Sequence, residues 1–160
     1  MYSRDLTLPA DTGFVNLRVG AIIQRDGAVL MVGNEMHDYY YSVGGRIQFG
    51  ESTEEAVIRE VEEETGCRLE IDRLGFVHEN FFYGDSESNL GKLVYEISFY
   101  FYMKTPEHFE PVCRSFTENQ HKEYLEWVRP DCPKQIYPDF FRTELASPSL
   151  SVKHIFTDER

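Results

Sequence analysis

The chain has 160 residues, of which 41% are hydrophobic and 28% charged, and this balance predicts one soluble domain over residues 1–160. It holds no run of about 18 apolar residues, so no membrane-spanning helix is expected. The net charge of −12 excludes a general nucleic-acid-binding protein, because such proteins need a basic surface.

The first third of the chain is typical of strands joined by a turn. Residues 15–24 and residues 28–33 are two apolar, strand-like runs. Between them, Arg25-Asp26-Gly27 contains an Asp-Gly pair, which predicts a tight hairpin turn. Residues 39–43 form a short strand-like run that leads into the glycine pair Gly44-Gly45.

A helix is predicted over residues 53–65. Ser52 is a good N-cap, and Glu55 three residues later completes a capping box. Gly66 supplies the left-handed residue that commonly ends a helix. The apolar residues Ala56, Val57 and Val61 form a stripe that can pack against a sheet.

The same helix carries a carboxylate cluster. Glu60, Glu63 and Glu64 are spaced i, i+3 and i+4, which places all three on one face. Like charges at this spacing repel one another, so the arrangement favours a neutralising hard cation with oxygen ligands, such as Mg²⁺. The alternative is a solvated acidic face, which is the interpretation we give to Glu54 and Glu62.

The remainder of the chain predicts further strands and a terminal helix. Strand-like runs lie at residues 68–83, 92–103 and 124–128, with a polar turn at 84–91. Residues 104–121 form a long loop, either a substrate flap or a plain insertion. Pro138 suits the first turn of a C-terminal helix whose buried side is Phe140, Phe141 and Leu145. Together these elements predict a mixed sheet between helical layers.

Cysteine and histidine usage adds two expectations. Cys67, Cys113 and Cys132 are odd in number and scattered, which indicates reduced thiols and a cytoplasmic location. The N-terminal residues lack the basic-then-apolar pattern of a secretory signal. No H-E-x-x-H occurs among the five histidines, so a zinc site is not predicted.

Residues 45–67 resemble the Nudix box, G-x5-E-x7-R-E-U-x-E-E-x-G-U, where U is apolar. The fixed positions are all matched, by Gly45, Glu51, Arg59, Glu60, Glu63, Glu64 and Gly66. Cys67 replaces the usual aliphatic residue at the last position, which is a mild departure because a buried cysteine behaves as a small hydrophobe.

The resemblance implies an α/β/α sandwich with a mixed β-sheet, the box forming its loop-helix-loop. It implies hydrolysis of a nucleoside diphosphate linked to another group, with Mg²⁺ as cofactor and Mn²⁺ as an alternative. Glu60, Glu63 and Glu64 would bind the metal. Arg59 would pair with Glu51 and orient the cluster, and Glu60 or Glu63 would act as the base. Family members often supply one further metal-binding or basic glutamate from the region near Trp127. Of Glu118, Glu123 and Glu126 we choose Glu123, and a solvated strand residue is the favoured alternative for each of them alone.

Substrate contacts are predicted less directly. The candidates are Arg18, Tyr40, Gly44, Gly45 and Arg46. Arg18 and Arg46, together with Arg25, are candidates for a local basic patch, although an ordinary surface charge is the favoured alternative for each of them alone. One of Tyr39, Tyr40 and Tyr41 would stack on a base, the alternative being sheet packing. His78 and Glu79 are candidates for a strand end facing the cleft, with a plain surface role as the alternative.

The sequence is compatible with more than one substrate and with more than one oligomeric state. Some ADP-ribose-specific members carry a proline shortly after the box, and none lies between Gly66 and Pro106, which weakens that specificity. The expected partner is a small nucleotide-type substrate, with no membrane and no general nucleic acid. The ten Tyr and twelve Phe are compatible with a homodimer. The competing function is a Nudix-fold nucleotide-binding or regulatory module without catalysis.

Overall fold

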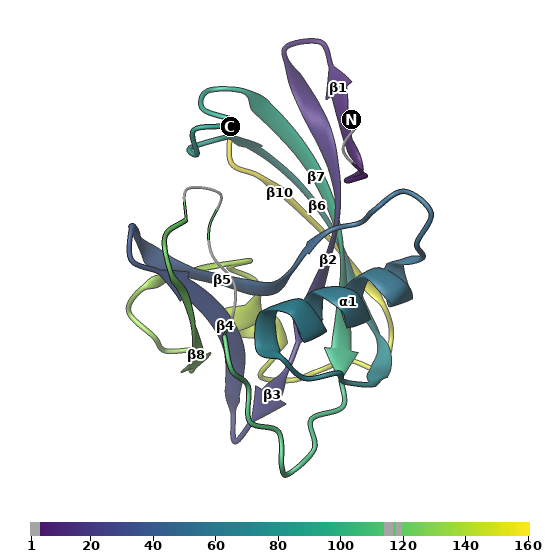
Figure 1. Cartoon of the computed structure of the whole chain (residues 1–160), viewed down its shortest axis with the longest axis vertical. Coiled ribbons are helices and arrows are strands. Elements are labelled where there is room, and N and C mark those ends of the chain that lie inside the picture. The colour runs from purple at the N-terminus through teal and green to yellow at the C-terminus, as the bar shows by residue number, and fades with distance from the viewer. Residues whose placement is uncertain (1–3, 114–116, 118–119) are drawn as a thin grey trace.

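The computed structural model describes residues 4–113, 117 and 120–160. Strands dominate, and one long helix lies across them (Figure 1). The elements in chain order are β1 (Thr7–Ala10), β2 (Gly13–Ile22), β3 (Gln24–Arg25), β4 (Ala28–Asn34), β5 (His37–Arg46), α1 (Thr53–Thr65), β6 (Ile71–Tyr83), β7 (Leu93–Met103), β8 (Glu123–Val128), β9 (Gln135–Tyr137), α2 (Phe141–Glu144) and β10 (Lys153–Asp158).

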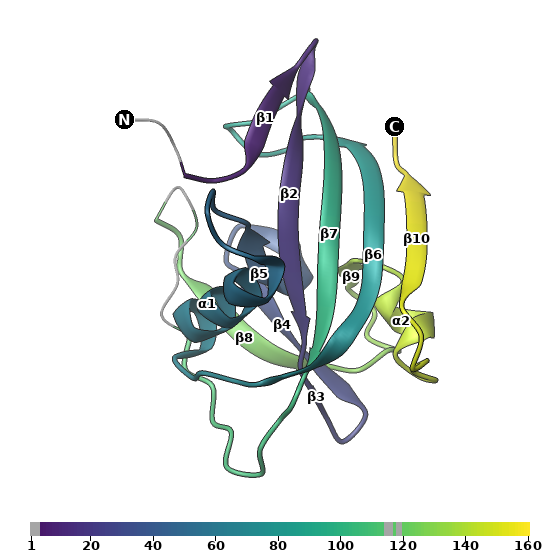
Figure 2. The ribbon, with the colours of Figure 1, turned by 90° about the vertical axis from the view of Figure 1, so that its right-hand side faces the viewer.

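The sheet is mixed, as predicted. Its main path runs β10-β6-β7-β2-β5-β4-β3, and Figure 2 shows β1, β2, β7, β6 and β10 side by side. β2 is parallel to β7 and antiparallel to β5, while β10 is parallel to β6. The strand β5 joins two parts of the sheet, because residues 43–46 pair with β2 whereas residues 39–42 pair with β4 and β9.

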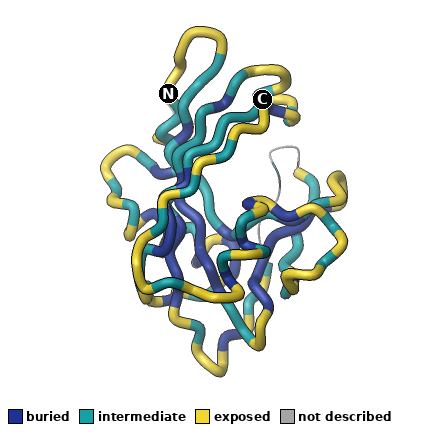
Figure 3. The backbone as a smooth tube through the Cα atoms, turned by 180° about the vertical axis from the view of Figure 1, so that it is seen from behind, coloured by how far each residue is buried: buried dark blue, intermediate teal, exposed yellow. Residues whose placement is uncertain are grey.

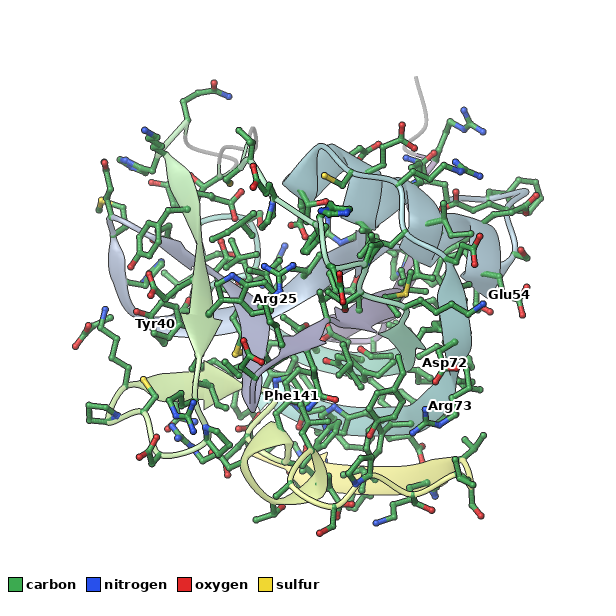
Figure 4. All side chains as sticks on the ribbon, turned by 90° about the horizontal axis from the view of Figure 1, so that it is seen from below. Arg25, Tyr40, Glu54, Asp72, Arg73 and Phe141 are labelled. Atoms are coloured by element: carbon green, nitrogen blue, oxygen red, sulfur yellow. The ribbon has the colours of Figure 1, made fainter. Side chains whose placement is uncertain are left out.

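Two apolar clusters lie on opposite faces of this sheet. The cluster beneath α1 contains the predicted stripe Ala56, Val57 and Val61, each fully buried, together with Val19 and Phe101. The second cluster packs around Phe141 of α2, which is labelled in the lower centre of Figure 4. Buried residues gather in the lower body, and the outer ends of the long strands extend beyond it (Figure 3).

Most predicted elements are confirmed, with shifted bounds. The hairpin turn forms at Asp26 and Gly27, both with positive φ, as an Asp-Gly turn of this kind requires. The terminal helix is a single turn that begins three residues after Pro138, and Phe141 and Leu145 are buried as expected. The strands β1, β9 and β10 were not predicted from the sequence.

The loop at 104–121 is partly fixed. Phe109 is buried and packs edge-on against Trp127, and its carbonyl accepts a 2.8 Å hydrogen bond from Arg25. Val112 donates a backbone bond to Thr65. The stretch around Phe109 is therefore anchored rather than a flap, while residues 114–116 and 118–119, and with them Glu118, lie outside the described residues. No helix in the described ranges is long and apolar enough to cross a membrane.

Candidate active site

The helix that carries the carboxylates begins and ends as the sequence predicts. Ser52 accepts a 3.2 Å hydrogen bond from the Glu55 amide, and its own amide donates 2.8 Å to the Glu55 carboxylate. At the other end Gly66 adopts φ 73° and its amide bonds to the Glu62 carbonyl. Both ends of α1 are capped, so the spacing of its acidic residues is held on a regular helix.

Arg59 organises the loop before the helix. Its Nε and Nη2 donate to the two oxygens of Glu51, at 3.0 and 2.6 Å, in a bidentate pair. Its Nη2 also donates to the backbone carbonyl of Arg46 at 3.0 Å. Hydrogen bonds from Arg59 lower the pKa of the Glu51 carboxyl below its ordinary value. The Arg59–Glu51 pairing implied by the box is thus present, and it ties α1 to β5.

Glu60 lies directly over Gly45. Its Oε1 accepts a 2.7 Å hydrogen bond from Arg59 Nη1, and its side chain is 13% exposed. A Cβ added to Gly45 would lie 2.4–2.5 Å from the Glu60 carboxyl atoms. Only a residue without a side chain at position 45 therefore leaves room for this carboxylate. Glu63 differs, because it is 58% exposed and meets only the edge of Arg59 at 3.4 Å.

Glu64 is the most buried acid of the helix, at 9% exposure. Its Oε2 accepts a 2.8 Å hydrogen bond from the Gly44 amide. Burial raises the pKa of Glu64 well above its ordinary value, and the neighbouring charges of Glu60 and Glu123 add to this rise. Burying an ionised carboxylate beside two others in an otherwise apolar interior lowers the stability of the fold.

Glu123 joins the cluster from a distant part of the chain. It opens β8 opposite Asn34 of β4, and it is 8% exposed. The Tyr41 hydroxyl donates a short hydrogen bond to its carboxylate. Burial and this bond raise the pKa of Tyr41 above its ordinary value, so the phenol stays protonated. Glu126 lies in the same strand, where it pairs with Met31 and is exposed.

A pocket of about 360 Å³ lies next to this cluster. Arg18, Tyr41 and Ser42 form its near side. The rest of the lining comes from β2, β6, β7, the segment from β9 to α2, and the end of the chain from β10 on. These residues are Val19, His78, Asn80, Glu96, Tyr100, Tyr137, Pro138, Asp139, Phe140, Thr143, Thr157 and Glu159. Because Tyr41 also bonds Glu123, the pocket and the carboxylates form one continuous region.

Arg18 is the cation at this junction. Its side chain is about one-third exposed and lies 3.8 Å from Glu96. Burial opposes its charge, but the attraction of Glu96, followed by Tyr100, Glu60 and Glu64, outweighs this and raises the pKa of Arg18. Arg18, a predicted substrate contact, therefore lies where an anionic group in the pocket could contact it close to the carboxylate cluster.

The other predicted substrate residues are placed differently. Gly44 and Gly45 lie against Glu64 and Glu60. Tyr40 is buried in the second apolar cluster against Tyr124, on the side of the molecule away from Glu54 at the start of α1 (Figure 4). The structure therefore does not bring the Tyr40 ring to the site, and its neighbour Tyr41 lines the pocket instead.

The predicted basic patch does not form. The Arg46 side chain faces Asp5 at 3.7 Å, and only its backbone carbonyl contributes to the cluster. Arg25 is held over the ring of Trp127, 5.0 Å from its centroid, under the anchored loop. Of the three candidate arginines, Arg18 alone lies at the site. His78 lines the pocket, whereas Glu79 bonds Tyr95 and His154 on the opposite face of β6.

A family model described as the NUDIX domain matches residues 15–143. The chain belongs to the Nudix family. Among curated proteins, a MutT-like protein of Streptomyces ambofaciens is 36% identical over 61 residues. This match covers 38% of the present chain, and it spans only 40% of that relative's length.

Solved structures agree on the Nudix fold. An ADP-ribose pyrophosphatase from Streptococcus suis is 18% identical, with a TM-score of 0.56 and coverage of 89% of this chain and 98% of that one. A MutT Nudix hydrolase from Burkholderia pseudomallei is 25% identical, with a TM-score of 0.55 and coverage of 78% and 91%. These similarities support the mixed-sheet Nudix fold.

The residues of this Nudix site fit a divalent cation. Glu60, Glu64 and Glu123 are oxygen donors of the type that Mg²⁺ prefers, and they are close enough to raise the pKa of Glu64. Within the described ranges, no three His, Cys, Asp or Glu side chains lie close enough together to hold a metal ion by themselves. Arg59 holds Glu60 and the Gly44 amide holds Glu64. An open site built from few protein ligands is the arrangement expected for Mg²⁺, which keeps several waters.

Proposed function

We propose that this chain is a Mg²⁺-dependent pyrophosphohydrolase that cleaves a phosphoric anhydride bond in a nucleoside diphosphate linked to another group. The observation that carries the proposal is the cluster of Glu60, Glu64 and Glu123, whose charges act on one another, and the nearby Arg18, which lines a pocket and feels the charges of Glu60 and Glu64. A structural acidic face would be solvated, whereas two of these three acids are under one-tenth exposed.

We assign the metal to Glu60, Glu63 and Glu64, with Glu123 as a further ligand and Mn²⁺ as an alternative ion. When bound, the ion would polarise the phosphoryl oxygens and offset the negative charge of the substrate. Membership of the family and the donor chemistry of these four residues support this assignment.

The protein's own groups have separate tasks in this proposal. Arg59 holds Glu51 and Glu60 in fixed positions through its hydrogen bonds. Gly44 and Gly45 let α1 approach β5 closely enough for two carboxylates to contact the strand. Arg18 receives a phosphate oxygen, which attracts an anionic substrate to a protein of net charge −12.

Glu60 and Glu63 are the candidates for accepting a proton from the attacking water. Glu60 lies against β5 at the cluster, while Glu63 is mostly exposed. Replacing each with glutamine keeps the shape of the side chain and removes the base. Loss of the base should lower kcat by about 10²-fold or more, and circular dichroism would check that the variant is folded. Near-normal turnover in either variant would remove that residue from the mechanism.

The central experiment measures phosphate or nucleotide release with Mg²⁺ and again with EDTA. Nucleoside triphosphates, ADP-ribose, nucleotide sugars and dinucleoside polyphosphates should be compared by kcat/KM. Turnover that EDTA abolishes and Mg²⁺ restores supports the proposal. Tight nucleotide binding without product release for any of these compounds would instead identify a non-catalytic binding module.

A further inference from the structure

A series of hydrogen-bonded polar side chains lies along the far wall of the pocket. The Asn80 amide donates a 2.8 Å hydrogen bond to Glu159. The Thr157 hydroxyl donates a 2.6 Å bond to the amide oxygen of Asn80. His78 Nε2 lies 2.8 Å from the same hydroxyl oxygen. These hydrogen bonds thus link the Glu159 carboxylate at one end to the His78 imidazole at the other.

The direction of these hydrogen bonds follows from the carboxylate. Glu159 can only accept, so it fixes the nitrogen of Asn80 toward itself and the oxygen toward Thr157. The single hydroxyl proton of Thr157 is then committed to Asn80. Thr157 must therefore accept from His78, which places the ring proton on Nε2 and leaves Nδ1 as an acceptor.

The imidazole is neutral in this setting. His78 is 7% exposed, and burial lowers its pKa to about 4. No hydrogen bond within the described part of the chain reaches its Nδ1, and Nδ1 is not among the buried polar atoms there that lack a partner. The acceptor nitrogen is therefore accessible, and its ring forms part of the pocket wall.

The surroundings suit a flat ring rather than an anion. Phe140 lies edge-on to His78 at 5.0 Å and to Tyr100 at 5.6 Å between ring centroids. Of the residues that line the pocket, Arg18 alone is an arginine or lysine, and it lies at the end next to the carboxylate cluster. The opposite end has acceptors and aromatic edges, so a phosphate fits only the Arg18 end.

We propose that this pocket binds the base of a nucleotide through the exocyclic amino group of the base, one N–H of which is accepted by His78 Nδ1. In this arrangement Glu159, Asn80 and Thr157 are positioning residues that fix the imidazole in its accepting tautomer. The inference rests on the proposed function, because a phosphate chain at the cluster is what brings a base into the pocket. Thr157 and Glu159 lie beyond residues 15–143, so the match to the family model does not supply them.

The chemistry predicts which bases are preferred. Cytosine and adenine carry an amino donor where uracil and hypoxanthine carry a carbonyl acceptor. When a carbonyl oxygen takes the place of the amino group, its lone pair faces the lone pair of His78 Nδ1 with no proton between them, and the hydrogen bond is lost. Loss of one such hydrogen bond with an unpaired partner corresponds to about a tenfold change in affinity.

The test measures binding of CMP against UMP, and of AMP against IMP, by calorimetry in the presence of Mg²⁺. Monophosphates contain no anhydride bond, so binding is measured without turnover. We expect the amino-bearing member of at least one pair to bind about tenfold more tightly. Thr157→Val should reduce that ratio to within about threefold, because the hydroxyl no longer fixes the ring tautomer. His154→Asn, in the same strand but mostly exposed on the other face, is the matched control and should leave the ratio unchanged.

The tautomer gives a second measurement that does not depend on affinity. Nitrogen NMR of the His78 ring should show a protonated Nε2 in the native protein and a mixture of tautomers in Thr157→Val. Equal binding within both pairs, no binding of any of the four nucleotides, or a protonated Nδ1 would overturn the inference. Selective binding without any Mg²⁺-dependent hydrolysis would overturn the proposed function and leave the base-binding pocket standing.

Discussion

Replacing Gly45 with alanine should impair catalysis while leaving the fold intact. The added methyl group would lie 2.4 Å from Cδ of Glu60 and 2.5 Å from each of its carboxylate oxygens. The carboxylate must move by about 1 Å to reach ordinary contact distance. Because it is the free end of a flexible side chain, it can move without shifting the backbone. A displacement of about 1 Å in a reacting arrangement costs about 10²-fold in rate.

The expected effect on stability is small. Gly→Ala at a compatible backbone position stabilises by about 0.4–1 kcal/mol, which offsets a weakened contact between Arg59 and Glu60. A net change of about 1 kcal/mol corresponds to about 2–4 °C in Tm for a chain of this size. The assay is kcat with Mg²⁺ and a thermal melt of the same preparation.

Gly44→Ala is the contrasting variant. Gly44 has φ 150°, and its added Cβ would lie 2.2 Å from the backbone oxygen of Val19, which cannot move aside. This variant should lose stability by about 1–3 kcal/mol or more. If Gly45→Ala keeps kcat within about threefold, or melts as early as Gly44→Ala, the reasoning about Glu60 is wrong.

Three further outcomes follow from the site. In the folded protein the pKa of Glu64 lies above its ordinary value of 4.5. Between pH 4.5 and that raised pKa the folded protein therefore binds more protons than the unfolded chain, and its stability falls as the pH rises through this range. Glu64→Gln should therefore have a higher Tm than the native protein near about pH 8 in EDTA. The difference in Tm should disappear below about pH 4.5 and in saturating Mg²⁺, and thermal melts over a range of pH would measure it. Arg59→Lys cannot reproduce the bidentate contact with Glu51, so kcat should fall by about 10-fold or more although the charge is kept, and an unchanged kcat would exclude the orienting role. Arg18→Ala should raise KM by about 10-fold with a smaller effect on kcat, and steady-state kinetics showing the reverse pattern would place Arg18 in the chemical step.

Local signals explain what the sequence predicted well. The bounds of α1 follow from Ser52, Glu55 and Gly66, which act within a turn of where they lie in the chain. The acidic face follows from helical spacing alone, and the hairpin follows from Asp26 and Gly27. None of these features depends on a partner that is distant in sequence.

The pocket could not be predicted because it depends on distant pairing. Its far wall requires β10 to lie parallel to β6, with Lys153 opposite Phe76, and no local pattern specifies that neighbour. The prediction that Tyr40 contacts the substrate was wrong for a related reason. Adjacent strand residues face opposite sides of a sheet, so Tyr40 enters the apolar core and Tyr41 faces Glu123.

The two halves of this cleft have different origins in the chain. Most of the carboxylate side comes from one continuous stretch, residues 44–64, whereas the opposite wall is assembled from β6, the turn before α2 and β10. Mutations in that wall can accumulate without disturbing the backbone of α1. Because the two sides come from different parts of the chain, substitutions can change the shape of the pocket wall while the residues of the carboxylate side stay the same.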